Sequence, residues 1–422
     1  MKAAIIGAGI SGLSLAWFLQ KEGIDFTVFE ASPRVGGKIE SDRSSGFFFE
    51  KGPRSFSVSR SDNLLDLIED LGLSKDIIGS ADSAKKRYLL LNEKLVGLPS
   101  SLSSLLTNPL SRKCFFPLLK EAFVKKGNAE DESIYSFAKR RFSSEVADIF
   151  FDPLTLGVYA GNCKELSIRS CFPALYEMEK EYGSLIRGMF FKKRKVKKYP
   201  FPLFSLKKGI GSLTSALHQK MQNNIQLNTP VLGVEPLNEG ILVTAAKKQE
   251  TFTHCFFATD FSNCKKLLPT LQIDIPSINL FVANVGFQKK VLRQDGFGFL
   301  IPSQEKKDIL GAVFDSNIFP DQSDPLQTRM TFMIKENCRS VEQTITNCLV
   351  NALGISNEPD YLNTYLVKNA IPQYEINHYK KIEGIQDRFS NLFLCGNYLQ
   401  GASVDQCIHQ SKKLVSKLKS FI

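Results

Sequence analysis

Histidine and paired cysteines are scarce in this chain, and long apolar runs are missing. Four histidines lie scattered among 422 residues, and none of the nine cysteines forms a Cys-x-x-Cys pair. This pattern argues against a metal site and a disulfide framework, and it favours a reducing compartment. No stretch reaches the ~18 apolar residues of a membrane-spanning helix, so we expect a soluble or peripheral protein. No charged segment with a following apolar run precedes the first strand, so we expect no cleaved targeting peptide.

The length and the charge of the chain limit its possible architectures and partners. At 422 residues the chain is long for one core, so two or more domains are expected. The formal net charge is +11, and the run at 192–198, Lys-Lys-Arg-Lys-Val-Lys-Lys, is flanked by aromatic residues. Such a run can touch an anionic membrane surface, attract a polycarboxylate substrate or remain a solvated loop. No nucleic-acid-binding module accompanies it, so nucleic acid is not an expected partner.

The first thirty residues carry a dinucleotide-binding fingerprint. A short apolar strand over 3–6 leads into Gly7-Ala8-Gly9-Ile10-Ser11-Gly12, then a helix over 13–21 and a strand over 26–29 that ends at Glu30. Gly7 permits a tight turn, Gly9 lets backbone N–H groups approach a pyrophosphate, and Gly12 lets helix and strand pack closely. The helix N-terminus favours phosphate, and the Glu30 carboxylate can accept hydrogen bonds from ribose hydroxyls.

Two further glycine motifs distinguish an FAD-binding site from an NAD-binding site. Arg34-Val35-Gly36-Gly37-Lys38 follows Glu30, and Gly52-Pro53-Arg54-Ser55 comes soon after. A whole FAD needs additional backbone contacts for its pyrophosphate and ribityl tail, whereas a mobile NAD does not. The order of the motifs therefore predicts bound FAD.

The end of the chain holds another strand–turn–helix unit. Residues 391–397 read as a strand and turn, 398–402 as a loop, and Ser403 caps a helix with Val404, Ile408 and Val415 on one face. Such a unit can reach an isoalloxazine ring, where a helix N-terminus stabilises the negative charge of reduced flavin. We therefore predict that both ends of the chain clasp one flavin.

The middle of the chain predicts helices and a second sheet. Helices are expected over 62–72, 110–125, 133–141, 145–153 and 340–353, a hairpin over 87–99, and strands over 225–231, 231–243, 253–259, 280–287, 297–301, 309–314 and 329–334. The apolar run 115–119 suits either core or a membrane-facing patch, and core is expected.

These patterns predict an α/β fold in three parts. A Rossmann-like FAD-binding domain would comprise residues 1–84, 205–268 and 383–422. A helical subdomain over 85–204 is a candidate for membrane contact. An inserted mixed or antiparallel sheet domain over 269–382 would bind the substrate.

Five segments, spread over nearly the whole chain, carry a family resemblance. They are residues 7–38, Phe49-Glu50-Lys51-Gly52-Pro53-Arg54, Gly157-Val158-Tyr159-Ala160-Gly161, Ile371-Pro372-Gln373-Tyr374, and Gly396-Asn397-Tyr398 with Val404. Together they resemble the protoporphyrinogen oxidases, flavoenzymes of haem synthesis on the amine-oxidase-like scaffold. The resemblance implies oxidation of protoporphyrinogen IX to protoporphyrin IX by three hydride transfers to flavin, which oxygen or another acceptor reoxidises.

The resemblance also implies roles for individual residues. Arg87 would pair with a substrate propionate, Gly157 would lie beside the tetrapyrrole, and Leu310 and Met333 would sandwich its ring. No metal and no obligatory acid or base is implied. Non-covalent FAD would be held by Gly7, Ala8, Gly9, Ile10, Ser11, Gly12, Glu30, Lys38, Gly52, Pro53, Arg54, Ser55, Val231, Asn397, Ala402, Ser403 and Val404.

Several alternatives stay open at this point. A related enzyme acts on coproporphyrinogen III, with four propionates, and the net charge of +11 mildly favours it. An amine oxidase or carotenoid desaturase, or a flavin-free binding protein, could use the same scaffold. Lys38 stands where relatives often have a large aromatic residue, the helical region is short, and the 192–198 run is unusually basic. Membrane attachment therefore remains one prediction among several, as do a cytoplasmic location at the inner face of the membrane and a ferrochelatase partner.

Overall fold

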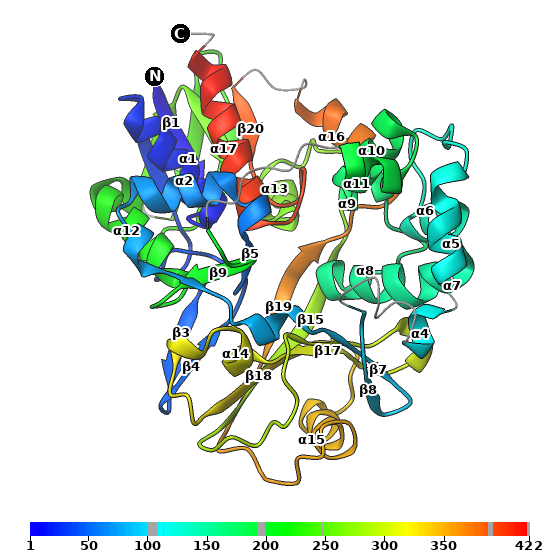
Figure 1. Cartoon of the computed structure of the whole chain (residues 1–422). Coiled ribbons are helices and arrows are strands. Elements are labelled where there is room, and N and C mark those ends of the chain that lie inside the picture. The colour runs from blue at the N-terminus through cyan, green and yellow to red at the C-terminus, as the bar shows by residue number, and fades with distance from the viewer. Residues whose placement is uncertain (100–107, 113, 192–198, 247, 387–390, 420–422) are drawn as a thin grey trace.

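The protein has three parts around a common centre (Figure 1). The structure is a computed structural model, and it describes residues 1–99, 108–112, 114–191, 199–246, 248–386 and 391–419. The basic run at 192–198 therefore lies outside the described residues. Both chain ends belong to the same α/β part, while a helical part and a large sheet occupy the other sides.

A five-stranded parallel sheet forms the centre of the α/β part. Its order is β10 (Ile225–Gln226), β2 (Asp25–Phe29), β1 (Lys2–Ile6), β14 (His254–Phe257) and β20 (Leu392–Leu394). Both faces are covered, which explains why β1 and β14 read as continuous apolar runs. One face packs against α1 (Ile10–Lys21), α2 (Asp62–Asp70), α12 (Gly211–Met221) and α17 (Val404–Lys419). The other packs against α13 (Phe261–Leu267) and a small sheet of β11 (Val231–Pro236), β12 (Ile241–Ala245) and β13 (Lys248–Phe252).

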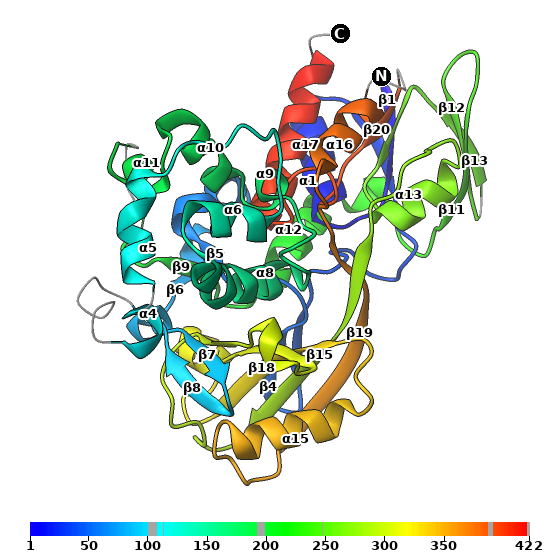
Figure 2. The same cartoon turned by 90° about the vertical axis from the view of Figure 1, so that its right-hand side faces the viewer.

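A seven-stranded sheet forms the second part. Its order is β19 (Tyr361–Pro372), β15 (Ser277–Phe287), β18 (Thr328–Lys335), β17 (Ile309–Val313), β16 (Gly298–Leu300), β7 (Tyr88–Leu91) and β8 (Lys94–Gly97). The pairing is antiparallel except between β16 and β7. Helix α15 (Val341–Asn351) covers one face, and α8 (Asp152–Tyr159) lies on the opposite side (Figures 1 and 2).

Short elements connect the two sheets. They are the hairpin of β3 (Ser41–Ser44) and β4 (Phe47–Glu50), the small sheet of β5 (Phe56–Ser57), β9 (Leu203–Leu206) and β6 (Ile77–Gly79), and the helices α14 (Asp315–Ile318) and α16 (His378–Gln386).

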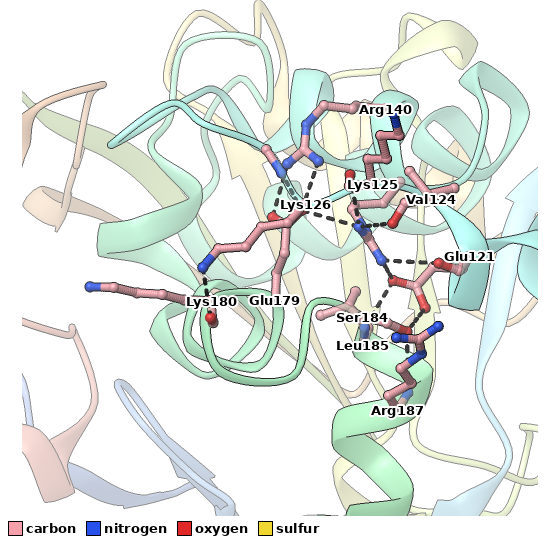
Figure 3. A network of polar contacts seen from close by, with 12 residues as sticks. Glu121, Val124, Lys125, Lys126, Arg140, Glu179, Lys180, Ser184, Leu185 and Arg187 are labelled. Carbon is pink, nitrogen blue, oxygen red and sulfur yellow. Dashed lines mark hydrogen bonds and ion pairs between the residues drawn. The ribbon is translucent and has the colours of Figure 1, made fainter.

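The helical part is built around a buried ionic network (Figure 3). Its helices are α4 (Pro109–Arg112), α5 (Phe115–Lys120), α6 (Ile134–Arg141), α7 (Ser144–Val146), α8, α9 (Ile168–Cys171), α10 (Pro173–Tyr182) and α11 (Leu185–Phe191). The Arg141 side chain is fully buried, and its Nε donates to Glu121 Oε1 at 2.8 Å. Burial opposes ionisation of Glu121, but hydrogen bonds from Ser184, Ile186, Leu185 and Arg141 outweigh it and hold the pKa below its ordinary value. Among the described residues, no helix combines the length and apolarity that crossing a bilayer requires.

Several element predictions are wrong in detail. Within the range 110–125, where one helix was expected, the described residues form α4, α5 and a 3₁₀ turn at Glu121–Phe123. Glu121 in this turn faces inward and binds Arg141. The helix expected to end at 153 continues through a π-helical turn into α8 and ends at Tyr159. Strands β13 and β19 and helix α16 were not predicted. The burial pattern of β19 alternates weakly, as expected of an edge strand with one partner.

The expectation that residues 115–119 form core is also wrong. Phe116 is 70% exposed and Leu119 is 54% exposed, and no residue of α5 is buried. The hairpin β7–β8 lies within the range expected for the helical subdomain, yet β7 pairs with β16 of the large sheet. We therefore propose that the boundary between these two parts follows Gly97.

Candidate functional site

The turn between β1 and α1 depends on two glycines. Gly7 has φ +107°, in the left-handed region that favours glycine, and its N–H donates to Phe29 O at 2.8 Å. A Cβ on Gly12 would lie 1.9 Å from Gly7 O, so any side chain there would push the helix away from the turn. The two residues therefore set the close approach of α1 to β1.

Gly9 has a different environment. No described atom lies within 4 Å of a Cβ built on Gly9, so its position faces open space. Gly9 is also the N-cap residue of α1, and within the described chain no side chain caps this helix end. The first N–H groups of α1 and its positive dipole end are therefore available to an anionic group.

Glu30 follows β2 directly and faces the same turn. Its Oε2 accepts a hydrogen bond from Ala8 N at 2.7 Å, and its Oε1 accepts one from Ser32 N at 2.9 Å. Thr229 N donates to Glu30 O at 2.8 Å, which brings the segment leading into Val231 alongside. The structure thus gathers three separate predicted segments at one edge of the sheet.

The second glycine motif packs directly on the first. Gly36 pairs with Gly9 in an isolated bridge, and a Cβ on Gly37 would lie 3.2 Å from Gly9 Cα. A Cβ on Gly52 would lie 2.0 Å from Lys38 O, so the Gly52–Ser55 segment passes tightly over the Lys38 backbone. Residues 7–12, 36–38 and 52–55 therefore form one continuous stretch of packed backbone, which we call the groove.

Lys38 bridges this groove to the large sheet. Its Nζ donates to Asn369 O and to Ala370 O, both on β19. Desolvation by the surrounding protein lowers the pKa of Lys38.

Arg54 makes a second bridge between the two sheets. Its Nη1 lies 2.8 Å from Asp315 Oδ1, and Asp315 Oδ2 accepts from Thr331 Oγ1 on β18 at 2.8 Å. Glu50, at the end of β4, accepts from Ile210 N at 2.8 Å and from Ser41 Oγ at 2.7 Å. Burial raises the pKa of Glu50 to about 7, although these hydrogen bonds and Arg54 act in the opposite direction.

The C-terminal unit returns to the N-terminal turn. Helix α17 packs on α1, and Ser411 Oγ donates to Ser11 O at 3.0 Å. Ser403 Oγ accepts from Gln406 N at 3.2 Å as the helix cap, and Val404 is buried in the cluster that contains α1. The loop from Asn397 to Ala402 therefore lies beside the groove, and the two ends of the chain are folded together.

These residues fit a bound FAD. The open space at Gly9, beside the N-terminus of α1, would suit a pyrophosphate, and the Glu30 carboxylate at the same turn would suit a ribose. The Cys395 thiol is buried against Ser411, and burial raises its pKa to about 12. A thiol of this kind stays protonated at neutral pH, which agrees with flavin held without a covalent link.

An apolar sheet face with one cation at its edge lies on the α8 side of the large sheet. The side chains of β18 alternate, so Phe332 packs toward α15 whereas Met333 packs with Phe297 on the opposite face. Leu310 lies in the β17 bulge, next to the pairing of Gly311 with Met333. The Arg87 guanidinium carbon lies 5.0 Å from the Phe297 ring centroid.

Burial lowers the pKa of Arg87, although the side chain is accessible, so the guanidinium sits in a partly enclosed place. Gly157 lies on α8, the helix that covers this face of the sheet. A Cβ on Gly157 would lie 2.5 Å from Leu300 Cδ2, so the glycine lets α8 approach β16 closely.

Sequence reasoning missed the residues that join the parts. Asp315 and Thr331 complete the Arg54 bridge, and Tyr374 and His378 connect the helical part to the 396–402 loop. The sequence did mark Tyr374, because it belongs to the Ile371–Tyr374 motif. No sequence pattern marked Asp315, since its partner is 261 residues away. Among the described residues, no cluster of three or more metal-ligating side chains is present.

Comparisons with known proteins agree with this arrangement. The family model of flavin containing amine oxidoreductases matches residues 10–415. The chain is 30% identical to protoporphyrinogen oxidase of Bos taurus, over 98% of this chain and 97% of the relative. It is 28% identical to coproporphyrinogen III oxidase of Staphylococcus aureus, over 97% of each.

Solved structures share the fold. A protein from Exiguobacterium sp. 255-15, assigned as a protoporphyrinogen oxidase, superposes with a TM-score of 0.87 at 20% identity and covers 100% of this chain and 99% of its own. Cyclohexylamine oxidase from Brevibacterium oxydans superposes with a TM-score of 0.73 at 13% identity, over 99% and 98%. The chain is therefore an FAD-dependent oxidoreductase of the flavin-containing amine oxidoreductases, and within them it belongs to the family of protoporphyrinogen and coproporphyrinogen III oxidases.

Proposed function

We propose that the chain oxidises protoporphyrinogen IX to protoporphyrin IX. The substrate loses six electrons and six protons in three steps, and oxygen or another acceptor takes up the electrons. The observation that carries the proposal is the apolar sheet face of Leu310 and Met333, with Arg87 at its edge, beside a dinucleotide groove. A flat apolar macrocycle with acidic side groups matches such a surface. The relatives named protoporphyrinogen oxidase support the same choice.

Each part of the surface has a proposed role. Met333 and Leu310 exclude water from the macrocycle, Gly157 lets the α8 backbone approach it, and Arg87 pairs with a propionate. When bound, FAD supplies the hydride acceptor. We propose that its contacts are the seventeen residues expected from the resemblance. Support comes from the packing of the segments: Gly36 pairs with Gly9, Gly52 packs on the Lys38 backbone, and α17 packs on α1.

We also propose that no side chain of the chain is an obligatory acid or base. Two buried carboxyl groups around Arg54 already have partners, since Asp315 binds Arg54 and Thr331, and Glu50 accepts from Ile210 N and Ser41. They therefore support the groove rather than reach a substrate. Replacing Asp315 by Asn should leave a measurable kcat when FAD is retained, and a near-complete loss of kcat would contradict this proposal.

The test is anaerobic reduction of the bound flavin by each porphyrinogen. Protoporphyrinogen IX should bleach the flavin absorbance faster than coproporphyrinogen III, and oxygen should restore it. Bleaching by coproporphyrinogen alone would favour the second candidate. That candidate is supported by the net charge of +11 and by the Staphylococcus aureus relative. Bleaching by neither would contradict a porphyrinogen oxidase and indicate a flavoprotein of the same fold with another substrate.

We further propose that the helical part docks on an anionic membrane surface. Six large apolar side chains on α5, the following turn and α11 are mostly exposed: Phe116, Leu119, Phe123, Met189, Phe190 and Phe191. Exposed basic side chains lie in the same segments, including Lys120, Lys125 and Arg187. Apolar insertion together with basic side chains is the pattern of peripheral membrane attachment.

Vesicle sedimentation tests this attachment. Phe190→Ser should weaken binding to phosphatidylserine vesicles and leave FAD content unchanged. Equal binding of the variant and the parent chain would contradict the proposal. The ferrochelatase partner and the cytoplasmic location at the inner face of the membrane stay predictions.

A further inference from the structure

Two motifs of the sequence, apart from Gly157, have no role in the proposed chemistry: residues 157–161 and residues 371–374. Residues 157–161 end α8, which forms one wall of the proposed substrate region. Residues 371–374 comprise the last two residues of β19 and the two residues after it. The structure brings both motifs together, next to the loop that follows β20.

Backbone and amide contacts fix the 371–374 motif to the helical part. Gln373 Nε2 donates to Tyr159 O at 2.8 Å, and Ser167 N donates to Tyr374 O at 2.8 Å. A Cβ on Gly161 would lie 2.0 Å from Gln373 Oε1, so the glycine makes room for this amide. The main chain of Tyr374 is therefore held by α8 and by the cap of α9.

The Tyr374 side chain points the other way, to the loop after β20. Its hydroxyl donates to Asn397 O, and its ring stacks on His378 with centroids 4.5 Å apart. His378 Nε2 lies 3.1 Å from Leu399 O. Because a carbonyl oxygen can only accept, Nε2 carries a proton and donates this second hydrogen bond. Two carbonyls of the 396–402 loop thus accept hydrogen bonds from the stacked rings of Tyr374 and His378.

The arrangement is more specific than core packing requires. Tyr374 is fully buried and belongs to an apolar cluster with Tyr159 and Leu166, where a phenylalanine would fill the same volume. A buried hydroxyl costs desolvation unless it is paired, and here its partner is a carbonyl of the loop proposed to hold FAD. The paired hydroxyl therefore indicates that Tyr374 fixes the position of that loop.

We propose that Tyr374 is a positioning residue that ties the 396–402 loop to α8, so that the FAD side and the substrate side of the active centre keep a constant spacing. The proposal rests on the proposed function for what each side binds. The Tyr374 hydroxyl and His378 hold the loop. The Gln373 amide holds the end of α8, and the Tyr374 carbonyl holds the cap of α9.

The test compares Tyr374→Phe with Tyr159→Phe. The control removes an equally buried hydroxyl from the same cluster, because Tyr159 donates to Cys171 O at 2.7 Å inside the helical part. In Tyr374→Phe, Asn397 O loses its buried donor, so FAD titrated into the apoprotein should bind about tenfold more weakly and the visible spectrum of the bound flavin should shift. Tyr159→Phe should lower the unfolding temperature and leave both flavin readouts unchanged.

These readouts need no porphyrinogen, so they stay informative if the proposed substrate is wrong. With an active substrate, Tyr374→Phe should lower kcat more than it raises KM, because spacing changes rather than substrate affinity. Should Tyr374→Phe not fold, His378→Phe carries the same test, since it keeps the ring stack and removes the donor to Leu399 O. Unchanged FAD binding and spectrum in the folded variant, or equal changes in Tyr159→Phe, would overturn the proposal.

Discussion

The buried carboxyl of Glu50 makes protein stability depend on pH in a definite direction. Its side chain is 3% exposed, and burial raises its pKa from an ordinary 4.5 to about 7. Between these two values the folded protein holds a proton that the unfolded chain has released. The contribution of this group to stability is therefore fully present below pH 4.5 and is lost as the pH rises through 7.

The size of the effect follows from the two pKa values. One pKa unit corresponds to about 1.4 kcal/mol, so this group should lower the free energy of unfolding by about 2.5 kcal/mol between pH 5 and pH 8. Glu50→Gln removes the titration but can still accept from Ile210 N and meet Ser41. Urea unfolding of the FAD-bound protein at both pH values measures the difference.

The parent chain should lose about 2.5 kcal/mol more than Glu50→Gln over this interval. Other titrating groups contribute equally to both proteins and cancel in the comparison. Parallel losses in the two proteins would refute the reasoning and would mean that Glu50 is ionised throughout.

Three further predictions concern the groove, the substrate edge and the helical part. Gly9→Ala should keep the unfolding temperature of the apoprotein but bind FAD at least tenfold more weakly in a titration. Gly12→Ala should lower the unfolding temperature, because only its Cβ meets backbone at 1.9 Å. Similar stabilities of the two variants would contradict this prediction. Arg87→Ala should raise KM for the porphyrinogen on the order of tenfold while FAD content stays constant, and loss of FAD would show a structural role instead. Glu121→Gln should lower the free energy of unfolding by roughly 3 kcal/mol in urea, because Arg141 keeps its charge in a fully buried place; a change below ~1 kcal/mol would contradict a buried ion pair.

Local chemistry explains which parts of the fold were predictable. The turn at Gly7–Gly12 and strands β1 and β2 are specified within thirty residues, by glycine geometry and by apolar strands buried on both faces. The expectation that both chain ends lie together is confirmed, because α17 packs on α1. The apolar residues of α17 recur at helical spacing in the sequence, and this apolar face has to be covered by another element.

Long-range pairing explains what was not predictable. Strand β19 pairs with β15, which precedes it by about eighty residues, so the local sequence could not show this pairing. The Arg54–Asp315 contact spans 261 residues, so no local pattern could indicate it. Phe116 looked like core because composition cannot tell a buried apolar run from one that faces outward.

The claim on which the account depends is that one dinucleotide lies between the N-terminal turn and the C-terminal loop. The most direct measurement is the visible spectrum of the purified protein, followed by denaturation and quantification of the released cofactor. The account predicts a yellow protein that releases one equivalent of intact FAD per chain, with none left covalently attached. A colourless protein that takes up no added FAD would contradict it.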